Sequence, residues 1–195
     1  MVATTYSSLK ISNLRLLFNK DIDLCNNFTS LIKNITISTV NIDKTNALRI
    51  IERSNIKYEL YRYDDSVREG RKVAEILNED ENQVFKTLVT VSNDRKHFVF
   101  VIPVNAELDL KKAAKVAGVK SIEMIHQKEL LPLTGYIHGG CSPIGMKKKF
   151  PTFIEESAQL FDHIFISAGK VGLQLKISPF DLKDYLECEF VSVVR

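Results

Sequence analysis

The stretch Asn82–Val104 reads NQVFKTLVTVSNDRKHFVFVIPV and predicts a β-hairpin. Two apolar runs, NQVFKTLVTV and KHFVFVIPV, flank the short polar turn SNDR. The first run is apolar on both faces: Val84 and Leu88 lie on one, and Phe85 lies on the other. Because a strand that is apolar on both faces must be covered on both, this run is expected to be a central strand.

Shorter elements precede and follow the hairpin. Asp109 is a helix-capping residue, Gly118 is a typical helix end, and Pro179 suits the first turn of a helix. No period recurs along the chain, so the prediction is a mixed α+β domain, with a mixed sheet or part-closed β-barrel as its core and helices around it. Helices are expected over 43–55, 68–78, 109–120, 126–133 (broken by Pro132) and 179–187, and further strands over 57–63, 151–156, 162–169, 172–177 and 188–194.

The first 40 residues differ from the rest of the chain. They are rich in Asn, Thr and Ile and show no sustained period, so we expect a poorly ordered extension before a domain over residues 41–195. No apolar run approaches the roughly 18 residues that span a bilayer, and the start of the chain lacks the order of a secretory signal. A cytoplasmic protein without a membrane partner is therefore expected.

The charge of the chain is nearly balanced. It carries 27 Lys and Arg residues against 24 Asp and Glu residues, and without residues 1–40 the balance is 23 against 22. DNA is therefore not an expected partner, and any polyanion must meet a local basic cluster. Cys25, Cys141 and Cys188 are far apart and show no zinc-ligand spacing, so neither a metal site nor a disulfide framework is expected.

Lys86 lies in the middle of the predicted central strand. An unpaired buried ammonium is costly, so this side chain requires a carboxylate, a route to solvent or an anionic ligand. A structural ion pair or a solvent-reaching lysine is one interpretation. A functional anion site is the other, and the residues alone leave both open.

The segment Gly135–Phe150, GYIHGGCSPIGMKKKF, contains four of the eight glycines in the chain. Glycine permits a close approach of backbone amides to an anion or an ester, although tight turns alone also explain such a cluster. Cys141 has only His138 nearby as a base, and a small semi-buried cysteine is favoured over a nucleophile. Neither GxGxxG nor a Walker loop is present, so no nucleotide cofactor is expected.

Several segments together resemble the YbaK family in their order and spacing. These are deacylases of Cys-tRNA(Pro), related to the editing domain inserted in bacterial prolyl-tRNA synthetases. The resemblance extends from about Asp43 to Arg195. It is carried by KTNALRIIERSNIKYELYRYDD, NQVFKTLV, VNAELDLKKAAKVAG, KSIEM, TGYIHGGCSPIGMKKKFPTF and SAGKVGLQL.

The resemblance implies a trans-editing enzyme that removes cysteine from mischarged tRNA(Pro), with no metal or cofactor. In such enzymes the thiol of the substrate attacks its own ester and leaves a cyclic thiolactone. The implied partners are the aminoacyl-tRNA acceptor end and, as a candidate, a prolyl-tRNA synthetase. The essential lysine of the family matches Lys86, and its substrate-binding residues match Tyr63, Gly139, Gly140, Ser167, Gly169 and Gln174.

Two positions depart from the family pattern. Gln174 stands where some members have an aspartate, and Glu69 stands near the place of a pocket phenylalanine. Two alternatives therefore accompany the Cys-tRNA(Pro) hypothesis: a deacylase for another small amino acid such as alanine, and a non-catalytic module that binds a tRNA end.

Overall fold

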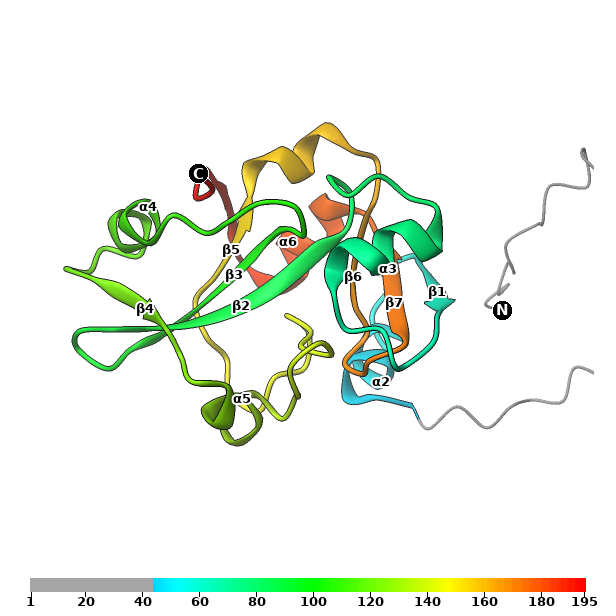
Figure 1. The fold of residues 1–195 in the computed structure, drawn as a ribbon, viewed down its shortest axis with the longest axis horizontal. Coiled ribbons are helices and arrows are strands. Elements are labelled where there is room, and N and C mark those ends of the chain that lie inside the picture. Colours follow the sequence, from blue (N-terminus) through cyan, green and yellow to red (C-terminus); the bar gives the residue numbers. More distant parts are fainter. Residues whose placement is uncertain (1–43) are drawn as a thin grey trace, which may run out of the picture. The chain divides into compact units, whose positions relative to one another are not determined.

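The structure is a computed structural model that describes residues 44–195. This part of the chain contains five α-helices, one 3-10 helix and eight strands (Figure 1). None of these helices is long and apolar enough to cross a membrane. The extension expected over residues 1–40 lies outside the described residues. The elements are α2 (Asn46–Ile51), β1 (Tyr58–Arg62), α3 (Gly70–Leu77), β2 (Phe85–Ser92), β3 (His97–Pro103), α4 (Leu110–Val116), β4 (Ile122–Met124), α5 (Gln127–Thr134), β5 (Thr152–Glu155), η2 (Glu156–Leu160), β6 (Ile164–Ser167), β7 (Leu173–Ile177), α6 (Pro179–Leu186) and β8 (Glu189–Val191).

The strands form two sheets. The predicted hairpin, β2 and β3, pairs antiparallel from Phe85 opposite Pro103 to Val91 opposite His97. It occupies the middle of a five-stranded sheet with the order β4-β2-β3-β5-β8, in which β5 pairs parallel with both neighbours. The other sheet is antiparallel, with the order β1-β7-β6. The mixed α+β prediction is confirmed, and the core consists of two sheets and not of a closed barrel.

One short parallel contact joins the two sheets. Val84, just before β2, pairs with Phe165 on β6, and the amide of Phe165 donates to the carbonyl of Gln83 at 2.8 Å. Both paired side chains are buried beside Ala74 of α3. Helix α3 therefore covers the place where the sheets meet.

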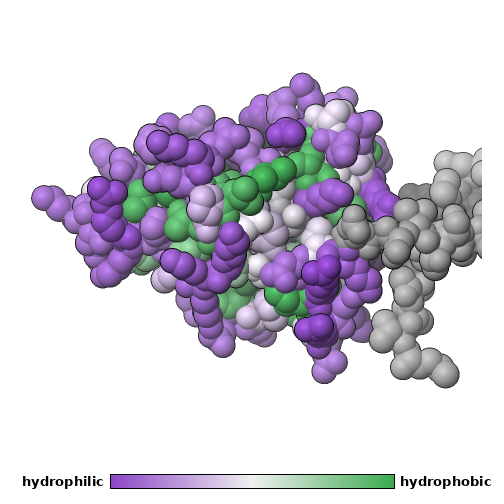
Figure 2. Space-filling model, turned by 90° about the horizontal axis from the view of Figure 1, so that it is seen from below, coloured by the Kyte–Doolittle hydropathy of each residue, from purple (hydrophilic) through white to green (hydrophobic). Residues whose placement is uncertain are grey.

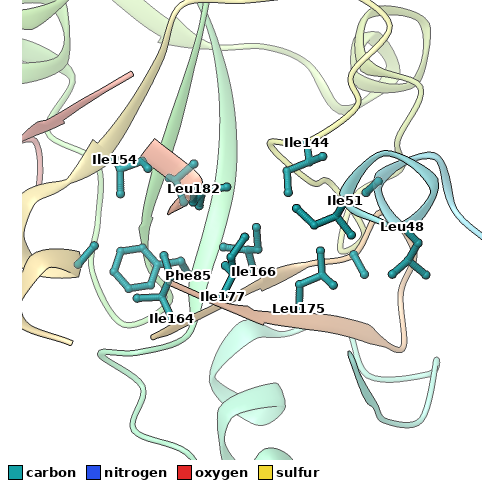
Figure 3. Packing of buried hydrophobic residues seen from close by; sticks show 14 of the residues in the cluster. Leu48, Ile51, Phe85, Ile144, Ile154, Ile164, Ile166, Leu175, Ile177 and Leu182 are labelled. Atoms are coloured by element: carbon teal, nitrogen blue, oxygen red, sulfur yellow. The ribbon is translucent and has the colours of Figure 1, made fainter. Parts of the chain in front are cut away.

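The main core lies between the two sheets and is completed by α2, α6 and the segment after α5 (Figure 3). Phe85 and Ile154 come from the five-stranded sheet, and Ile166 and Leu175 come from the three-stranded sheet. Burial of such side chains contributes about 1.5–3 kcal/mol each. This packing fixes the strands that carry the candidate site.

The remaining two helices lie on opposite faces of the five-stranded sheet (Figure 1). Helix α4 packs through Ala113 and Ala114 on Phe98 and Phe100, whereas α5 packs through Leu130 on the face that contains Val99. Asp109 caps α4, as predicted: its side chain accepts hydrogen bonds from the amides of the first turn. The five-stranded sheet therefore separates an exposed surface that includes α4 from one that includes α5.

One expected local feature is wrong. Pro132 does not break the helix over 126–133, because α5 continues through it to Thr134. Proline removes one backbone hydrogen bond of the helix, and a helix as short as α5 has few internal hydrogen bonds to lose.

Candidate active site

The strand register aligns four polar side chains across both sheets. Gln174 on β7 lies opposite Tyr61 on β1 and opposite Ser167 on β6. Ser167 is two residues beyond Phe165, and Lys86 is two residues beyond the pairing partner of Phe165, Val84. Because strand side chains alternate with period two, Lys86, Ser167 and Gln174 point to one face. The structure thus brings together three of the residues expected at the site.

Lys86 is half-buried and is held by backbone carbonyl groups. Its ammonium donates to the carbonyl of Ala106 at 2.7 Å and to that of Val104 at 3.1 Å. No carboxylate of residues 44–195 forms an ion pair with it. An ammonium has three N–H donors, so one remains for a ligand oxygen.

Burial lowers the pKa of Lys86, and the positive charge of Arg71 acts in the same direction. The negative charge of Glu107 opposes both. The side chain is thus partly desolvated and aimed by two hydrogen bonds. These properties suit the stabilisation of negative charge on a reacting oxygen.

Gln174 presents an unsatisfied acceptor to the same face. The residue is only 6% exposed, and its side-chain oxygen Oε1 is buried without a hydrogen-bond partner. A buried acceptor without a partner costs about 1–3 kcal/mol, so a ligand that donates a hydrogen bond there would recover that energy. The aspartate of some family members would place a charge here, whereas the amide places a neutral acceptor.

Two glycine-containing loops meet beside Ser167. A Cβ on Gly140 would lie 2.9 Å from the amide nitrogen of Val171, and a Cβ on Gly139 would lie 3.3 Å from Cβ of Arg68. The backbone of the loop that contains Gly139 and Gly140 therefore lies directly against the turn that joins β6 and β7. Only a residue without a side chain permits this approach at Gly140.

The same turn is packed against an aromatic ring on its other side. A Cβ on Gly169 would lie 2.7 Å from Cε1 of Tyr136, whose hydroxyl donates to the carbonyl of Ile144 at 2.6 Å. The backbone amide of Gly169 donates to the side chain of Ser167 at 3.2 Å. This packing holds the Ser167 hydroxyl and the glycine loop in one arrangement.

Tyr63 belongs to the same region, and Glu69 stays at its edge. The amide of Tyr63 donates to the carbonyl of Gly172 at 3.0 Å, so Tyr63 follows β1 directly onto the β6–β7 turn. Glu69 is the exposed residue before α3 and pairs with Lys72 at 3.0 Å. A charged, solvated residue therefore stands near the position that the family resemblance assigns to a pocket phenylalanine.

Cys141 belongs to the glycine loop itself, and it is buried and only 8% exposed. Burial raises the pKa of its thiol to about 12. A thiol is nucleophilic only as the thiolate, so Cys141 is inert near neutral pH. His138, considered as its base, is exposed to solvent.

The sequence did not reveal the groups that hold Lys86. Both acceptors are main-chain carbonyls of the segment after β3, and a carbonyl is present at every residue. One indirect sign exists: a Cβ on Gly70, at the start of α3, would lie 2.5 Å from Cγ1 of Val104. A glycine at that position allows the helix to press on the segment that binds the ammonium.

Comparison with protein families finds a match over residues 64–185 to the aminoacyl-tRNA editing domain. A protein of Enterococcus faecalis, provisionally named Cys-tRNA(Pro)/Cys-tRNA(Cys) deacylase EbsC, is 45% identical over 152 residues. That alignment covers 77% of this chain and 93% of the relative. A proline–tRNA ligase of Shouchella clausii is 29% identical over 101 residues, which cover 52% of this chain and 18% of the ligase.

Solved structures share the fold at low sequence identity. A crystal structure described as a provisional trans-editing enzyme for prolyl-tRNA synthetase has a TM-score of 0.66 and 20% identity, over 71% of this chain and 87% of that one. A hypothetical protein has a TM-score of 0.73 and 20% identity, over 77% of this chain and all of that one. These likenesses support the architecture described above.

Proposed function

The chain belongs to the aminoacyl-tRNA editing family, and on this premise we propose that it removes cysteine from mischarged Cys-tRNA(Pro) with the substrate thiol as nucleophile. One observation carries the proposal. Lys86 offers a positioned ammonium with a free donor, whereas the nearby protein thiol, Cys141, is buried with a raised pKa. The name of the enterococcal relative supports cysteine as the amino acid.

The need for such an enzyme follows from the limits of pocket fit. A synthetase pocket separates amino acids of similar size by only about 1–3 kcal/mol, so the fit of the pocket alone does not fully exclude cysteine in place of proline. A second site that recognises a different property of the misattached residue corrects these errors. The thiol is the property that distinguishes cysteine from proline.

In the proposed reaction the cysteine thiolate attacks the carbonyl carbon of its own ester. A carbon–sulfur bond forms and the bond from the carbonyl carbon to the ribose oxygen breaks, which gives a cyclic thiolactone and tRNA with a free hydroxyl. The thiol proton passes to solvent, and the ribose oxygen takes a proton as it leaves. A reaction within one oriented molecule avoids the entropic cost of bringing in a nucleophile.

The chain contributes orientation and charge stabilisation to this reaction. The free N–H of Lys86 stabilises the oxygen on which negative charge develops. The Oε1 atom of Gln174 accepts a hydrogen bond from the aminoacyl group, and the amides near Gly139 and Gly140 confine the ribose and ester. Tyr63, Ser167 and Gly169 form the remaining contacts of the pocket.

The test is turnover on Cys-, Ser- and Ala-esters of tRNA(Pro), with Cys-tRNA(Cys) as a further substrate. Cysteine should be released much faster than serine or alanine from the same tRNA, and mass spectrometry of early quenched samples should detect the thiolactone before free cysteine. S-methylation of the substrate cysteine should abolish turnover. Rapid release of alanine with solvent oxygen in the product would establish a water-based alanine deacylase instead. Binding without turnover of any ester would establish a binding module.

A further inference from the structure

The glycine segment forms a closed loop that connects the candidate site with α5. The amide of Lys147 donates to the carbonyl of Thr134 at 3.0 Å, which joins the two ends of the loop at the last residue of α5. The tip of the loop, at Gly139 and Gly140, lies against Arg68 and the turn at Lys170. A continuous surface therefore leads from the site, over the loop, to α5.

Exposed cations without carboxylate partners follow this surface. Lys149 forms an ion pair with Glu187, but Lys147 and Lys148 form none with any carboxylate of the described residues. Arg68 and Lys170 near the tip of the loop and Lys128 on α5 also form no ion pair with these residues. We name this set the basic track: Arg68, Lys170, Lys147, Lys148 and Lys128.

The two ends of the basic track differ in their surroundings. Arg68 and Lys170 flank the tip of the loop at the site. At the other end, a groove of about 590 Å³ between α5 and the β2–β3 hairpin is lined by Lys128 and Arg95 together with Glu123 and Glu129. Because two carboxylates balance the cations there, the surplus of positive charge ends at α5.

Helix α5 lies below the five-stranded sheet in Figure 1. Figure 2 views the molecule from that side, and strongly hydrophilic side chains project around a central band of apolar and near-neutral surface. Residues 41–195 as a whole have almost no net charge, since they carry 23 basic and 22 acidic side chains.

We propose that the basic track binds the phosphate backbone of the tRNA acceptor stem, so that the stem lies on the α5 face of the five-stranded sheet. This inference rests on the proposed function, because it assumes that the ester at the tRNA end enters the site beside the loop tip. That end is single-stranded, and the double-stranded stem must then lie farther out, where the cations of the loop base and α5 are found. Lysine and arginine contacts to phosphates position a nucleic acid without reading its sequence.

The opposite face of the sheet provides a matched control. Helix α4 carries Lys111 and Lys115, which are exposed and also lack ion pairs within the described residues. They lie on the face opposite α5, above the cluster around Phe100, and the side chain of Lys86 points to the same face because Lys86 pairs with Ile102 of that cluster. Number and exposure of the cations are therefore comparable, and only their position differs.

The experiment compares Lys128→Ala/Lys148→Ala with Lys111→Ala/Lys115→Ala in the full-length protein, with uncharged tRNA(Pro) as the probe. Neither Lys128 nor Lys148 makes a side-chain hydrogen bond to the described residues, so the fold should persist; circular dichroism checks this. The track variant should bind about tenfold more weakly, and its slope of log K against log salt should be smaller by about 2. The α4 variant should bind like the parent.

A shorter probe locates the effect. The parent should bind intact tRNA more tightly than an oligonucleotide that ends in CCA. The ratio of these two affinities should be about tenfold smaller in the track variant, because only binding of intact tRNA should weaken. Equal losses in both variants, or a loss confined to the α4 variant, would refute the proposal. A protein that deacylates none of the esters but shows the expected loss in the track variant would refute the proposed function and leave the basic track in place.

Discussion

The ammonium of Lys86 lies 2.7 Å from the carbonyl oxygen of Ala106, so a residue near the start of strand β2 is tied to the segment that follows β3. A second bond, to Val104, completes the tether. The structural and the functional interpretation of this lysine are therefore compatible: two donors hold the side chain and the third stays available.

Replacing Lys86 by alanine should lower deacylation by about 10²–10³-fold, the range for loss of one preorganised contact to a transition state. Lys86→Arg should not restore the rate, because a planar guanidinium cannot present the same three donors to two carbonyls and a ligand. Single-turnover rates measure the effect, and a melting curve of each variant separates it from unfolding. Full activity of folded Lys86→Ala would remove Lys86 from the mechanism.

The alkaline limit of activity should lie below the ordinary pKa of a lysine. Burial lowers the pKa of Lys86 from 10.5, so its ammonium loses the proton at a lower pH than a free lysine does. Because the charged form is the active one, kcat/KM should fall as pH rises through that lowered pKa. A rate profile on Cys-tRNA(Pro), measured at pH values where the ester is stable, checks the position of this limb. A limb unchanged in Lys86→Arg would assign it to another group.

Cys141→Ser should keep activity within a few-fold of the parent, because a buried thiol with a pKa raised to about 12 cannot act as the nucleophile. In the folded parent, iodoacetamide at pH 8 should leave Cys141 largely unmodified, as mass spectrometry of its peptide would show. Denaturation should make the same residue reactive. An inactive but folded Cys141→Ser protein would show that the thiol takes part in the reaction.

Local signals in the sequence predict the hairpin and the helix starts correctly. The alternation around the SNDR turn, Asp109 as a cap and Pro179 at the first turn of α6 each act within a few residues. The pairing of distant strands has no such signal. The short strand β4 and the parallel pairs of β5 depend on residues far apart in the chain, and so does the separation into two sheets.

The candidate site shows the same limit. Lys86 is conspicuous in the sequence because a charge interrupts an apolar strand, and the glycine loops are conspicuous by composition. The alignment of Lys86 with Ser167 depends on a single bridge between Val84 and Phe165, which no local pattern reveals. The unpaired oxygen of Gln174 likewise follows from burial in three dimensions.

Gly140→Ala should lower kcat/KM strongly and change the melting temperature little. Its new Cβ would lie 2.9 Å from the amide nitrogen of Val171 and 3.1 Å from the carbonyl carbon of Lys170, so the loop tip must move away from the β6–β7 turn. The control is Gly118→Ala: its φ of +68° strains the backbone by about 1–2 kcal/mol, but nothing lies within 4 Å of the new atom. Gly118→Ala should therefore lower the melting temperature without changing kcat/KM. The reverse pattern would place the loop tip outside the site.

Glu155 makes a prediction for stability that is independent of catalysis. This carboxylate is 3% exposed and accepts a hydrogen bond from the amide of Val193 at 2.8 Å, which fixes the end of the chain after β8. Glu155→Ala should cost about 1–3 kcal/mol, because the amide of Val193 loses its partner. Glu155→Gln keeps an oxygen acceptor and should cost less.

Burial raises the pKa of Glu155 above 4.5, so between that value and the raised pKa the folded state binds more protons than the unfolded state. The free energy of unfolding should therefore fall as pH rises through this window, and Glu155→Gln should flatten that slope. Urea denaturation at a series of pH values from 4 upward measures both effects. A slope that persists in Glu155→Gln would assign it to another group.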